Sequence, residues 1–225
     1  MKHLVVLTGA GMSAESGVKT FRDAGGLWEG HDVMAVASPQ GFARNPELVL
    51  EFYNERRKQL HEVKPNSGHI HLAELEHNFK VTIVTQNIDN LHERAGSSEV
   101  IHLHGELFKV RSTKNESDVK TWTADLNKGD TCDQGHQLRP HIVWFGEEVP
   151  MIETAIDICQ TADILLIIGT SMQVYPAAGL LNYAPHDTPI YFIDPNPAIA
   201  SSHRITVISE SATQGLPIFK QLIGL

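Results

Sequence analysis

Short apolar runs separated by polar segments set the predicted architecture. Four of these runs are rich in β-branched residues and lack polar alternation: "LVVL" (4–7), "VTIV" (81–84), "ILLII" (164–168) and "IYFI" (190–193). Continuous runs of this kind are typical of strands buried on both faces of a parallel sheet. Helical patterns lie between them, at 151–162 and 177–184. This alternation predicts an α/β fold with a Rossmann-like, doubly wound parallel sheet.

Two segments depart from the alternation. Residues 31–64 contain a helix introduced by "RNPELVL", in which Asn45 is a good N-cap and Pro46 suits the first helical position. Residues 109–140 are polar, with few large apolar residues, and indicate an inserted module. We expect a single domain over 1–225, with a large lobe from 1–30, 65–108 and 141–225 and a small lobe from 31–64 and 109–140.

Composition narrows the class of protein. The 225 residues are 41% hydrophobic and carry a formal net charge of -9 without a long Lys/Arg run, so we expect no nucleic-acid partner. The longest apolar run, at 164–169, is too short to span a bilayer, and "MKHLVVLTG" is too short for a signal peptide. The two cysteines, Cys132 and Cys159, fit a reducing compartment. We therefore expect a cytoplasmic monomer with no membrane partner.

A glycine turn follows the first strand. Gly9, Gly11 and Ala14 have G-x-G-x-x-A spacing, which lets the backbone approach a pyrophosphate and offers it the N-terminus of the next helix. The same spacing also occurs in plain strand–helix turns. About 20 residues further on, a dehydrogenase has an acidic residue that ends a second strand. Here the chain reads "VKTFRDAGGLWEG", which argues against hydride transfer and keeps a dinucleotide plausible.

An ordered set of blocks covers nearly the whole chain: "GAGMSAESGVKTFRDAGGLW" (9–28), "PNSGHIHLAEL" (65–75), "TQNIDNLHERAG" (85–96), "IHLHGEL" (101–107), "RPHIVWFGE" (139–147) and "IIGTSMQVYPAAGL" (167–180). Together they resemble the sirtuins, NAD-dependent protein lysine deacylases, and among them the class III members. The resemblance implies removal of succinyl, malonyl and also acetyl groups from lysines of peptides or proteins, with release of nicotinamide and O-acyl-ADP-ribose.

The resemblance also assigns the catalytic residues. His104 matches the histidine that activates a ribose hydroxyl, after the acyl oxygen has attacked the ribose carbon that nicotinamide leaves. Asn87 resembles the residue that contacts the nicotinamide ribose, and Asp89 the acceptor for the nicotinamide carboxamide. The alternatives are that His104 is one of 13 histidines without a special role, and that "QNID" only introduces a helix. For that helix Asn90 is the better cap candidate.

The implied NAD site draws on most of the blocks. Phe21 would shield the reactive face from water and Arg22 would brace the ribose and phosphates, although Arg22 also suits a plain surface salt bridge. Asn196 is a better hydrogen-bonding candidate than Asp194 for the adenosine ribose. The complete expected set is Gly9, Ala10, Gly11, Ala14, Phe21, Arg22, Trp28, Gln86, Asn87, Ile88, Asp89, Gly169, Thr170, Ser171, Asp194, Asn196 and Ala212.

Substrate selection is expected from two places. In "HIVWFGE" an extended segment suits β-strand addition by a peptide, so that Val143 would meet the acyl-lysine amide and Phe145 would line its tunnel; an ordinary buried strand end is the alternative. Tyr53 and Arg56 are three residues apart on one helix face and match the class III pair that binds an acidic acyl group. Ala24 also matches that class and leaves room for a longer chain.

Arg57, next to this pair, points about 100° away on a helix and is not expected to take part.

The zinc site of most sirtuins is not expected here. The family's structural zinc ribbon uses two CxxC pairs, and residues 109–140 contain no such pair. Cys132 and His136 would supply only two of four ligands, and Cys159 fits a small apolar core residue. We therefore predict no zinc and a degenerate zinc-ribbon-like module held by packing around Trp122 and Leu126.

Two other functions remain as alternatives. A non-catalytic ADP-ribose sensor would need no intact base or nicotinamide pocket, whereas His104, Asn87 and Asp89 are all present. An NAD glycohydrolase or ADP-ribosyltransferase would share the first half-reaction, and would release nicotinamide without an acyl-lysine.

Overall fold

The computed structural model describes residues 1–19, 27–28, 30–172 and 174–225. Its main sheet has six parallel strands in the order β11-β10-β9-β1-β4-β5. The strands are β1 (His3–Thr8), β4 (Lys80–Thr85), β5 (Val100–His102), β9 (Ile164–Ile168), β10 (Ile190–Ile193) and β11 (Ile205–Ile208). The four predicted strands and the α/β class are confirmed. The order places β1 at the centre, from which the chain proceeds first to one side and then to the other.

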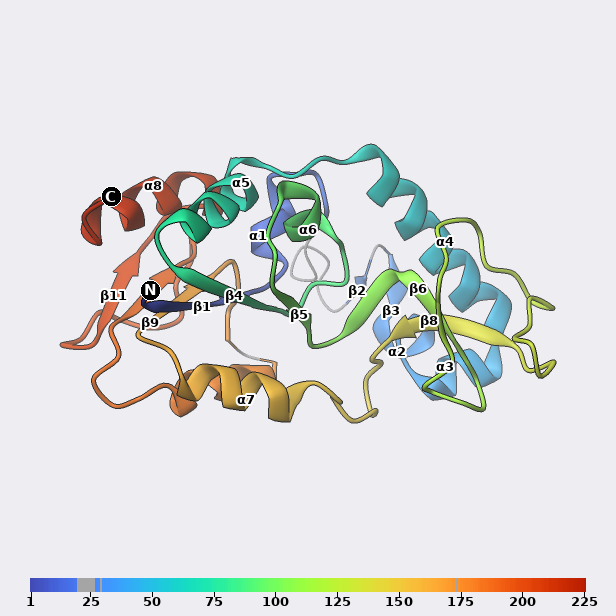
Figure 1. The fold of residues 1–225 in the computed structure, drawn as a ribbon. Helices are drawn as coiled ribbons and strands as arrows, with labels where there is room; N and C mark the ends of the chain where they lie inside the picture. Colours follow the sequence, from blue (N-terminus) through green and yellow to red (C-terminus); the bar gives the residue numbers. More distant parts are fainter. Residues whose placement is uncertain (20–26, 29, 173) are drawn as a thin grey trace.

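Helices cover both faces of this sheet (Figure 1). Along β1, Leu4 and Val6 belong to one apolar cluster and Val5 and Leu7 to the other, because successive side chains point to opposite faces. The first cluster packs under α5 (Ser67–Glu74), the 3₁₀ helix η2 (Leu75–His77) and α8 (Ala212–Leu222). The second packs over α7 (Ile152–Gln160) and the 3₁₀ helix η3 (Ala177–Tyr183). The core therefore lies in two layers, as the strand pattern predicted.

Some elements differ from the sequence prediction. The segment 177–184 forms the 3₁₀ helix η3 instead of an α-helix, and β11 was not predicted because "ITVI" is a short edge strand with partly exposed residues. The short strand β5 leads directly to His104. Short runs of this kind carry little periodicity, so they are recognised only from their pairing.

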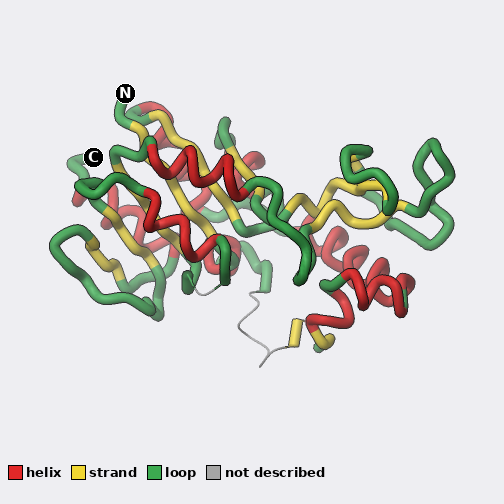
Figure 2. The backbone as a smooth tube through the Cα atoms, turned by 90° about the horizontal axis from the view of Figure 1, so that it is seen from below, coloured by secondary structure: helices red, strands yellow, loops and turns green. Residues whose placement is uncertain are grey.

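A smaller part of the molecule lies beyond β5 (Figures 1 and 2). Its elements are the two-stranded sheet of β2 (Leu27–Trp28) and β3 (His31–Asp32), and the helices α2 (Val33–Val36), α3 (Pro39–Arg44) and α4 (Pro46–Glu62). The Asn45 side chain accepts a hydrogen bond from the Leu48 N–H at 3.1 Å, so the predicted N-cap of α4 is confirmed. One face of α4 packs against Trp144 and Leu107 in a shared apolar cluster.

The predicted module contains a three-stranded antiparallel sheet in the order β7-β6-β8, formed by β6 (Gly105–Ser112), β7 (Val119–Thr121) and β8 (Leu138–Ile142). Figure 2 shows this sheet extending away from the six-stranded one. Strands β6 and β8 both run across the boundaries expected at 108 and 141. The division into two lobes at those residues stays a prediction.

Packing and hydrogen bonds hold the module to α4. Leu126 is fully buried with Leu50, Val110 and Cys132, and Trp122 packs against this cluster, as predicted. The buried Asn54 side chain bonds both polar backbone groups of Leu126, accepting from its N–H at 2.9 Å and donating to its C=O at 3.1 Å. The Asn54 side chain thus supplies hydrogen-bond partners for an N–H and a C=O that would otherwise be buried without any.

Replacing Asn54 by alanine is expected to lower the free energy of unfolding by about 2–4 kcal/mol, because the buried N–H and C=O of Leu126 lose their partner. The substitution also removes the acceptor for the Arg57 guanidinium at 2.8 Å. Urea unfolding measures the change. Asn115→Ala, in an exposed turn of the same module, is the control and should change it by less than about 1 kcal/mol. Equal effects of the two substitutions would contradict this account.

Candidate functional site at the carboxyl edge of the sheet

The expected cofactor residues follow the carboxyl ends of neighbouring parallel strands. Gly9 follows β1, Gln86 follows β4, Gly169 follows β9 and Asp194 follows β10. Because all of these strands are parallel, the four residues that follow them lie at one edge of the sheet. The strand order reverses at β1, and ligands of open α/β sheets bind at such a switch point.

Three glycines pack backbone against backbone at the switch point. A Cβ atom on Gly11 would lie 2.8 Å from the Cα of Gly169, and one on Gly9 would lie 2.7 Å from the Cβ of Thr170. Gly169 itself has a φ of 65°, and its Cβ would lie 2.2 Å from the Met12 nitrogen. These residues must be glycines for the β1 turn to approach the end of β9 this closely.

The helix after this turn differs from the prediction. Helix α1 (Gly11–Ala14) has only four residues. Its N–H groups are used within the chain: that of Gly11 donates to Gly169, that of Met12 to Gly9 and that of Ser13 to Ala10. The expectation that α1 offers free N–H groups to a pyrophosphate is therefore wrong for these residues. The tight turn is confirmed, and the cofactor contacts of Gly9, Ala10, Gly11 and Ala14 stay predictions.

A buried polar network joins Asn87 to Asp89. The Asn87 amide donates to the Gly9 carbonyl at 3.1 Å and to the Ser13 hydroxyl at 3.2 Å. Ser13 in turn donates to Asp89 Oδ2 at 2.9 Å, and its hydroxyl oxygen lies 3.5 Å from His69 Nε2. Two acceptors therefore hold the Asn87 amide and the Ser13 hydroxyl holds Asp89, so both side chains are fixed at the sheet edge, as recognition of a polar ligand group requires.

Asp89 also accepts a hydrogen bond from the start of the next helix, α6 (Leu91–Ala95). Its Oδ1 accepts from the Leu91 N–H at 3.1 Å, whereas the Asn90 side chain makes no capping bond. Asn90 therefore occupies the N-cap position, as expected, but the side-chain bond to the first turn comes from Asp89. Burial raises the pKa of the Asp89 carboxyl, and the bonds from Leu91 and Ser13 act against this. Asp89 therefore bonds the first turn of α6 and also places a carboxylate oxygen at the candidate site.

The buried His69 ring predicts a pH dependence of stability. Its Nδ1 accepts from the Asn66 N–H at 3.3 Å, which requires a neutral ring, and burial lowers its pKa to about 4, with Glu93 acting in the opposite direction. The unfolded chain therefore binds more protons between about pH 4 and 6.5. We expect the free energy of unfolding to decrease as pH falls through this window, by up to about 3 kcal/mol from this residue.

Urea unfolding at pH 7 and pH 5 measures this contribution as the difference between the protein and a His69→Asn variant. The variant should have a shallower pH slope. His186→Asn, at a side chain that is 91% exposed, is the control and should keep the original slope. A His69→Asn variant with an unchanged slope would contradict the assignment.

His104 lies directly after β5 with a defined tautomer. Its Nδ1 lies 3.0 Å from the Gln86 carbonyl oxygen, which can only accept, so this nitrogen carries the hydrogen and Nε2 keeps a lone pair. Burial lowers the pKa of His104, although the bond to Gln86 acts in the other direction. A neutral imidazole with a free Nε2 lone pair is able to accept a proton from a hydroxyl.

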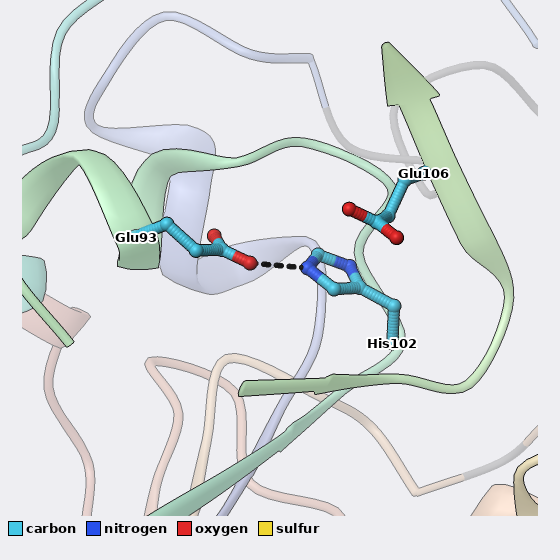
Figure 3. Close-up of side chains that lie close together, drawn as sticks. All are labelled: Glu93, His102 and Glu106. Carbon is cyan, nitrogen blue, oxygen red and sulfur yellow. Dashed lines mark hydrogen bonds and ion pairs between the residues drawn. The ribbon is translucent and has the colours of Figure 1, made fainter. Parts of the chain in front are cut away.

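The neighbouring His102 anchors the same loop in a different way (Figure 3). Its Nδ1 lies 2.9 Å from the Asn87 carbonyl and its Nε2 lies 2.7 Å from Glu93 Oε1. Burial works against the charged ring, but the bond to Glu93 prevails and raises the pKa of His102.

Glu106 completes a group whose ligand atoms all lie within 4.8 Å of one another, and it also pairs with Lys109. In the described residues, each member of the group already has a partner of opposite charge. The cluster therefore supports the Asn87 loop through ion pairs.

Of the residues expected to contact the adenosine end of NAD, some form hydrogen bonds within the chain and others are partly or fully exposed. The Gln86 amide donates to the Thr170 hydroxyl at 3.1 Å, which also accepts from the Met172 N–H. Buried Asp194 accepts from the Asn196 N–H at 2.9 Å, and Asn196 itself is exposed. Ser171 is half-buried and Ala212 is buried at the start of α8. This arrangement agrees with the preference for Asn196 over Asp194 as a ligand contact.

Tyr53 and Arg56 occupy different surroundings on α4. Tyr53 is fully buried, and its hydroxyl accepts from the Trp144 indole N–H at 2.9 Å. The guanidinium of Arg56 lies 4.4 Å above the Phe52 ring and lines a cavity of about 50 Å³ with Ile88, Asp89, Leu107, Val18, Lys19, Gln59 and Leu60. The cavity connects Arg56 to the Asp89 loop.

Arg57 is buried elsewhere, where it donates to the Leu107 carbonyl and to Asn54. Its exclusion from the expected pair agrees with this position.

The expected peptide segment is only partly extended. Strand β8 ends at Ile142, and the N–H groups of Val143, Trp144 and Phe145 donate to His104, Glu147 and Ala37 within the chain. These three N–H groups are therefore not available for the predicted strand addition in this structure. The Phe145 side chain is 44% exposed and Val143 is half-buried, so both side chains remain accessible.

Both cysteines lie in the described part of the chain, Cys159 in the apolar core and Cys132 in the module at 109–140. Cys159 is fully buried in α7, and burial raises its pKa to about 12. The Cys132 thiol donates to the Ser112 hydroxyl at 3.5 Å, and its N–H donates to the His136 carbonyl at 2.8 Å. With two cysteines in the whole chain, a four-thiolate zinc site is excluded by the sequence.

Four of the predicted site residues have side chains outside the described part of the structure. Phe21, Arg22 and Ala24 lie outside the described residues, and Trp28 is described only as part of the backbone of β2. Three residues of the site were not predicted: Ser13, His102 and Trp144. Each lies inside a recognised block, but its partner lies in another part of the fold, and a hydroxyl, imidazole or indole in such a block has no spacing signal of its own.

Comparisons with known proteins agree on one family. Residues 9–176 match the model described as "Sir2 family". A protein of Bacteroides thetaiotaomicron named "NAD-dependent protein deacylase" is 57% identical and covers 99% of this chain and 98% of its own. A Helicobacter pylori protein of the same name is also 57% identical, over 96% of this chain and 93% of its own.

Among solved structures, a Sir2 homolog–NAD complex superposes with a TM-score of 0.89 at 36% identity, covering 99% of this chain and 89% of that one. A Sir2 variant with a deacetylated p53 peptide and 3′-O-acetyl ADP-ribose gives 0.81 at 27% identity, over 99% and 94%. No helix in the described part of the chain is long and apolar enough to cross a membrane.

Proposed function

Because the chain belongs to the Sir2 family, we propose that it is an NAD-dependent protein lysine deacylase that favours succinyl and malonyl over acetyl groups. The observation that carries the proposal is the arrangement of His104, Asn87 and Asp89 at the switch point of the sheet. The relatives named "NAD-dependent protein deacylase" support the NAD requirement and the reaction class. Their name does not specify the acyl group.

The residues at the sheet edge fit NAD. The glycines let the β1 turn lie directly against the end of β9, since a Cβ at Gly9 or Gly11 would collide with Gly169 or Thr170. Asp89 can accept from the nicotinamide carboxamide, and Asn87 would lie beside the nicotinamide ribose. NAD supplies the ribose carbon that takes up the acyl oxygen, together with the nicotinamide leaving group. The glycine turn and Asn196 would hold the remaining part of the dinucleotide.

His104 is the residue that moves a proton. The Gln86 carbonyl keeps the hydrogen on Nδ1, so Nε2 is the atom that accepts a proton from a ribose hydroxyl. Because burial lowers the pKa of His104, the ring stays neutral near neutral pH. His102, which is two residues earlier, has the opposite environment next to Glu93 and is unsuited to this task.

The acyl preference rests on Tyr53 and Arg56. Burial raises the pKa of the Tyr53 phenol, so it remains a neutral hydrogen-bond donor. Arg56 lines the cavity beside Asp89 with a permanently charged fork that suits a carboxylate. A charge-assisted hydrogen bond contributes about 1.5–3 kcal/mol, which corresponds to about tenfold or more in preference.

The test measures the loss of succinyl, malonyl and acetyl groups from lysine peptides by mass spectrometry, with and without NAD. Removal should require NAD, and Tyr53→Phe combined with Arg56→Met should lower desuccinylation by about tenfold or more relative to deacetylation. Arg57→Met cannot serve as the control, because Arg57 is buried. Arg44→Met, at the end of α3, is the matched control.

Equal loss of desuccinylation and deacetylation in the double variant would contradict the acidic preference. Nicotinamide release that does not depend on an acyl-lysine would favour an NAD glycohydrolase or ADP-ribosyltransferase instead. NAD binding without turnover would favour a sensor. We further propose that the protein acts as a cytoplasmic monomer on protein substrates and does not bind nucleic acid.

A further inference from the structure

We propose that Trp144 is a positioning residue for acyl selection, which holds the Tyr53 hydroxyl in the orientation that favours an acidic acyl group. The inference rests on the proposed function and deepens it. Trp144 lies 91 residues beyond Tyr53 in the chain, and its indole Nε1 donates to the Tyr53 hydroxyl oxygen at 2.9 Å in a buried environment.

The chemistry of the two groups determines the direction of this hydrogen bond. An indole N–H can only donate, so the phenol oxygen of Tyr53 must accept. The hydrogen of the Tyr53 hydroxyl is thereby directed away from Trp144. Since this hydrogen is the one that a carboxylate would accept, the indole determines which way Tyr53 presents its donor.

The tyrosine ring itself has little freedom. It is fully buried, with the Phe52 ring at a centroid distance of 5.2 Å and an interplanar angle of 89°. The Trp144 ring lies at 6.4 Å with an interplanar angle of 29°. These two rings hold the tyrosine ring in place, and the indole N–H holds its hydroxyl oxygen.

Trp144 is in turn held by a partly buried ion pair. The Cζ atom of Arg139 lies 3.4 Å from the centroid of the Trp144 ring, and the Trp144 backbone N–H donates to Glu147 Oε2 at 2.8 Å. Glu147 also accepts from Arg139 Nη2 at 3.1 Å and from Arg111 Nη2 at 3.3 Å. Such a pair contributes little net stability compared with apolar packing, and it does fix geometry. Here it fixes the plane of the indole.

The prediction concerns selectivity, because acetyl-lysine has no carboxylate to accept from Tyr53. Trp144→Phe keeps an aromatic ring and removes the N–H. We expect the ratio of kcat/KM for succinyl-lysine to that for acetyl-lysine to fall by about three- to tenfold, the effect of one neutral hydrogen bond. The change should appear as a higher KM for the succinyl peptide, with deacetylation as the internal measure of intact catalysis.

The matched control is Trp122→Phe. Trp122 also donates its indole N–H, to the Asp125 carbonyl at 3.1 Å, but it lies in the module away from Tyr53. This variant should keep the selectivity ratio. In a Tyr53→Phe background, Trp144→Phe should cause no further fall in the ratio, because its effect passes through the Tyr53 hydroxyl.

Two results would overturn the inference. If Tyr53→Phe lowers the ratio and Trp144→Phe does not, Trp144 has no positioning role although the proposed acyl recognition stands. If Tyr53→Phe itself leaves the ratio unchanged, the recognition by Tyr53 fails and this inference fails with it. Should Trp144→Phe not fold, benzothienylalanine at position 144 keeps the shape of the indole and lacks only the N–H, and the same ratio is measured.

Discussion

Replacing His104 by alanine is expected to lower kcat/KM for NAD-dependent deacylation by about 100- to 10 000-fold, the range of a general base. The side chain lies directly after β5, its Nδ1 hydrogen is held by the Gln86 carbonyl, and burial keeps the ring neutral. Its backbone carbonyl accepts from the Val143 N–H at 2.9 Å, and this bond survives the substitution. The loss should therefore come from the missing base and leave the loop in place.

Mass spectrometry of a succinyl-lysine peptide over time, with saturating NAD, measures this effect, and calorimetry measures NAD binding. NAD binding should change by only a few fold. His186→Ala removes a histidine whose side chain is 91% exposed and should leave the rate unchanged. A His104→Ala variant that retains a tenth or more of the activity would show that another group accepts the proton.

Replacing Gly169 by alanine is expected to lower the free energy of unfolding by about 2–4 kcal/mol, and NAD binding by at least about tenfold. The new Cβ would lie 2.2 Å from the Met12 nitrogen and 2.6 Å from the Gly11 carbonyl carbon. Both atoms are backbone, so no side chain can rotate away. The β1 turn has to separate from β9, and this turn is where the dinucleotide is expected to lie.

Gly135→Ala separates the collision from the backbone strain. Gly135 has a φ of +80°, similar to the +65° of Gly169, but a Cβ there would meet nothing within 4 Å. Gly135→Ala should lower the free energy of unfolding by about 1 kcal/mol and should leave NAD binding unchanged. Urea unfolding and calorimetric titration with NAD give both quantities. Equal destabilisation by the two substitutions would mean that the close approach of the two turns does not matter.

The hydrophobic pattern was sufficient for the main sheet because its strands are buried on both faces. Each of the four predicted runs forms a strand, and the cap at Asn45 begins α4 as predicted. The pattern did not predict the edge strand β11 or the 3₁₀ form of η3, since their residues lack the periodicity that distinguishes one type of secondary structure from another. At the start of α6, Asn90 occupies the N-cap position as predicted, but Asp89 accepts the bond from the Leu91 N–H, because the backbone geometry brings its carboxylate to that group.

The order of motifs along the sequence by itself determined the family, and it predicted an NAD-binding edge with His104, Asn87 and Asp89. Those conclusions depend on residue type and on which residues follow parallel strands. Only the tertiary structure decided how these side chains are held: Ser13 between Asn87 and Asp89, Asn54 against Leu126, and Trp144 on Tyr53. The physical reason is that each of these bonds joins residues more than 70 positions apart, and a buried hydrogen bond depends on distance and direction in space, which residue spacing along the chain does not determine.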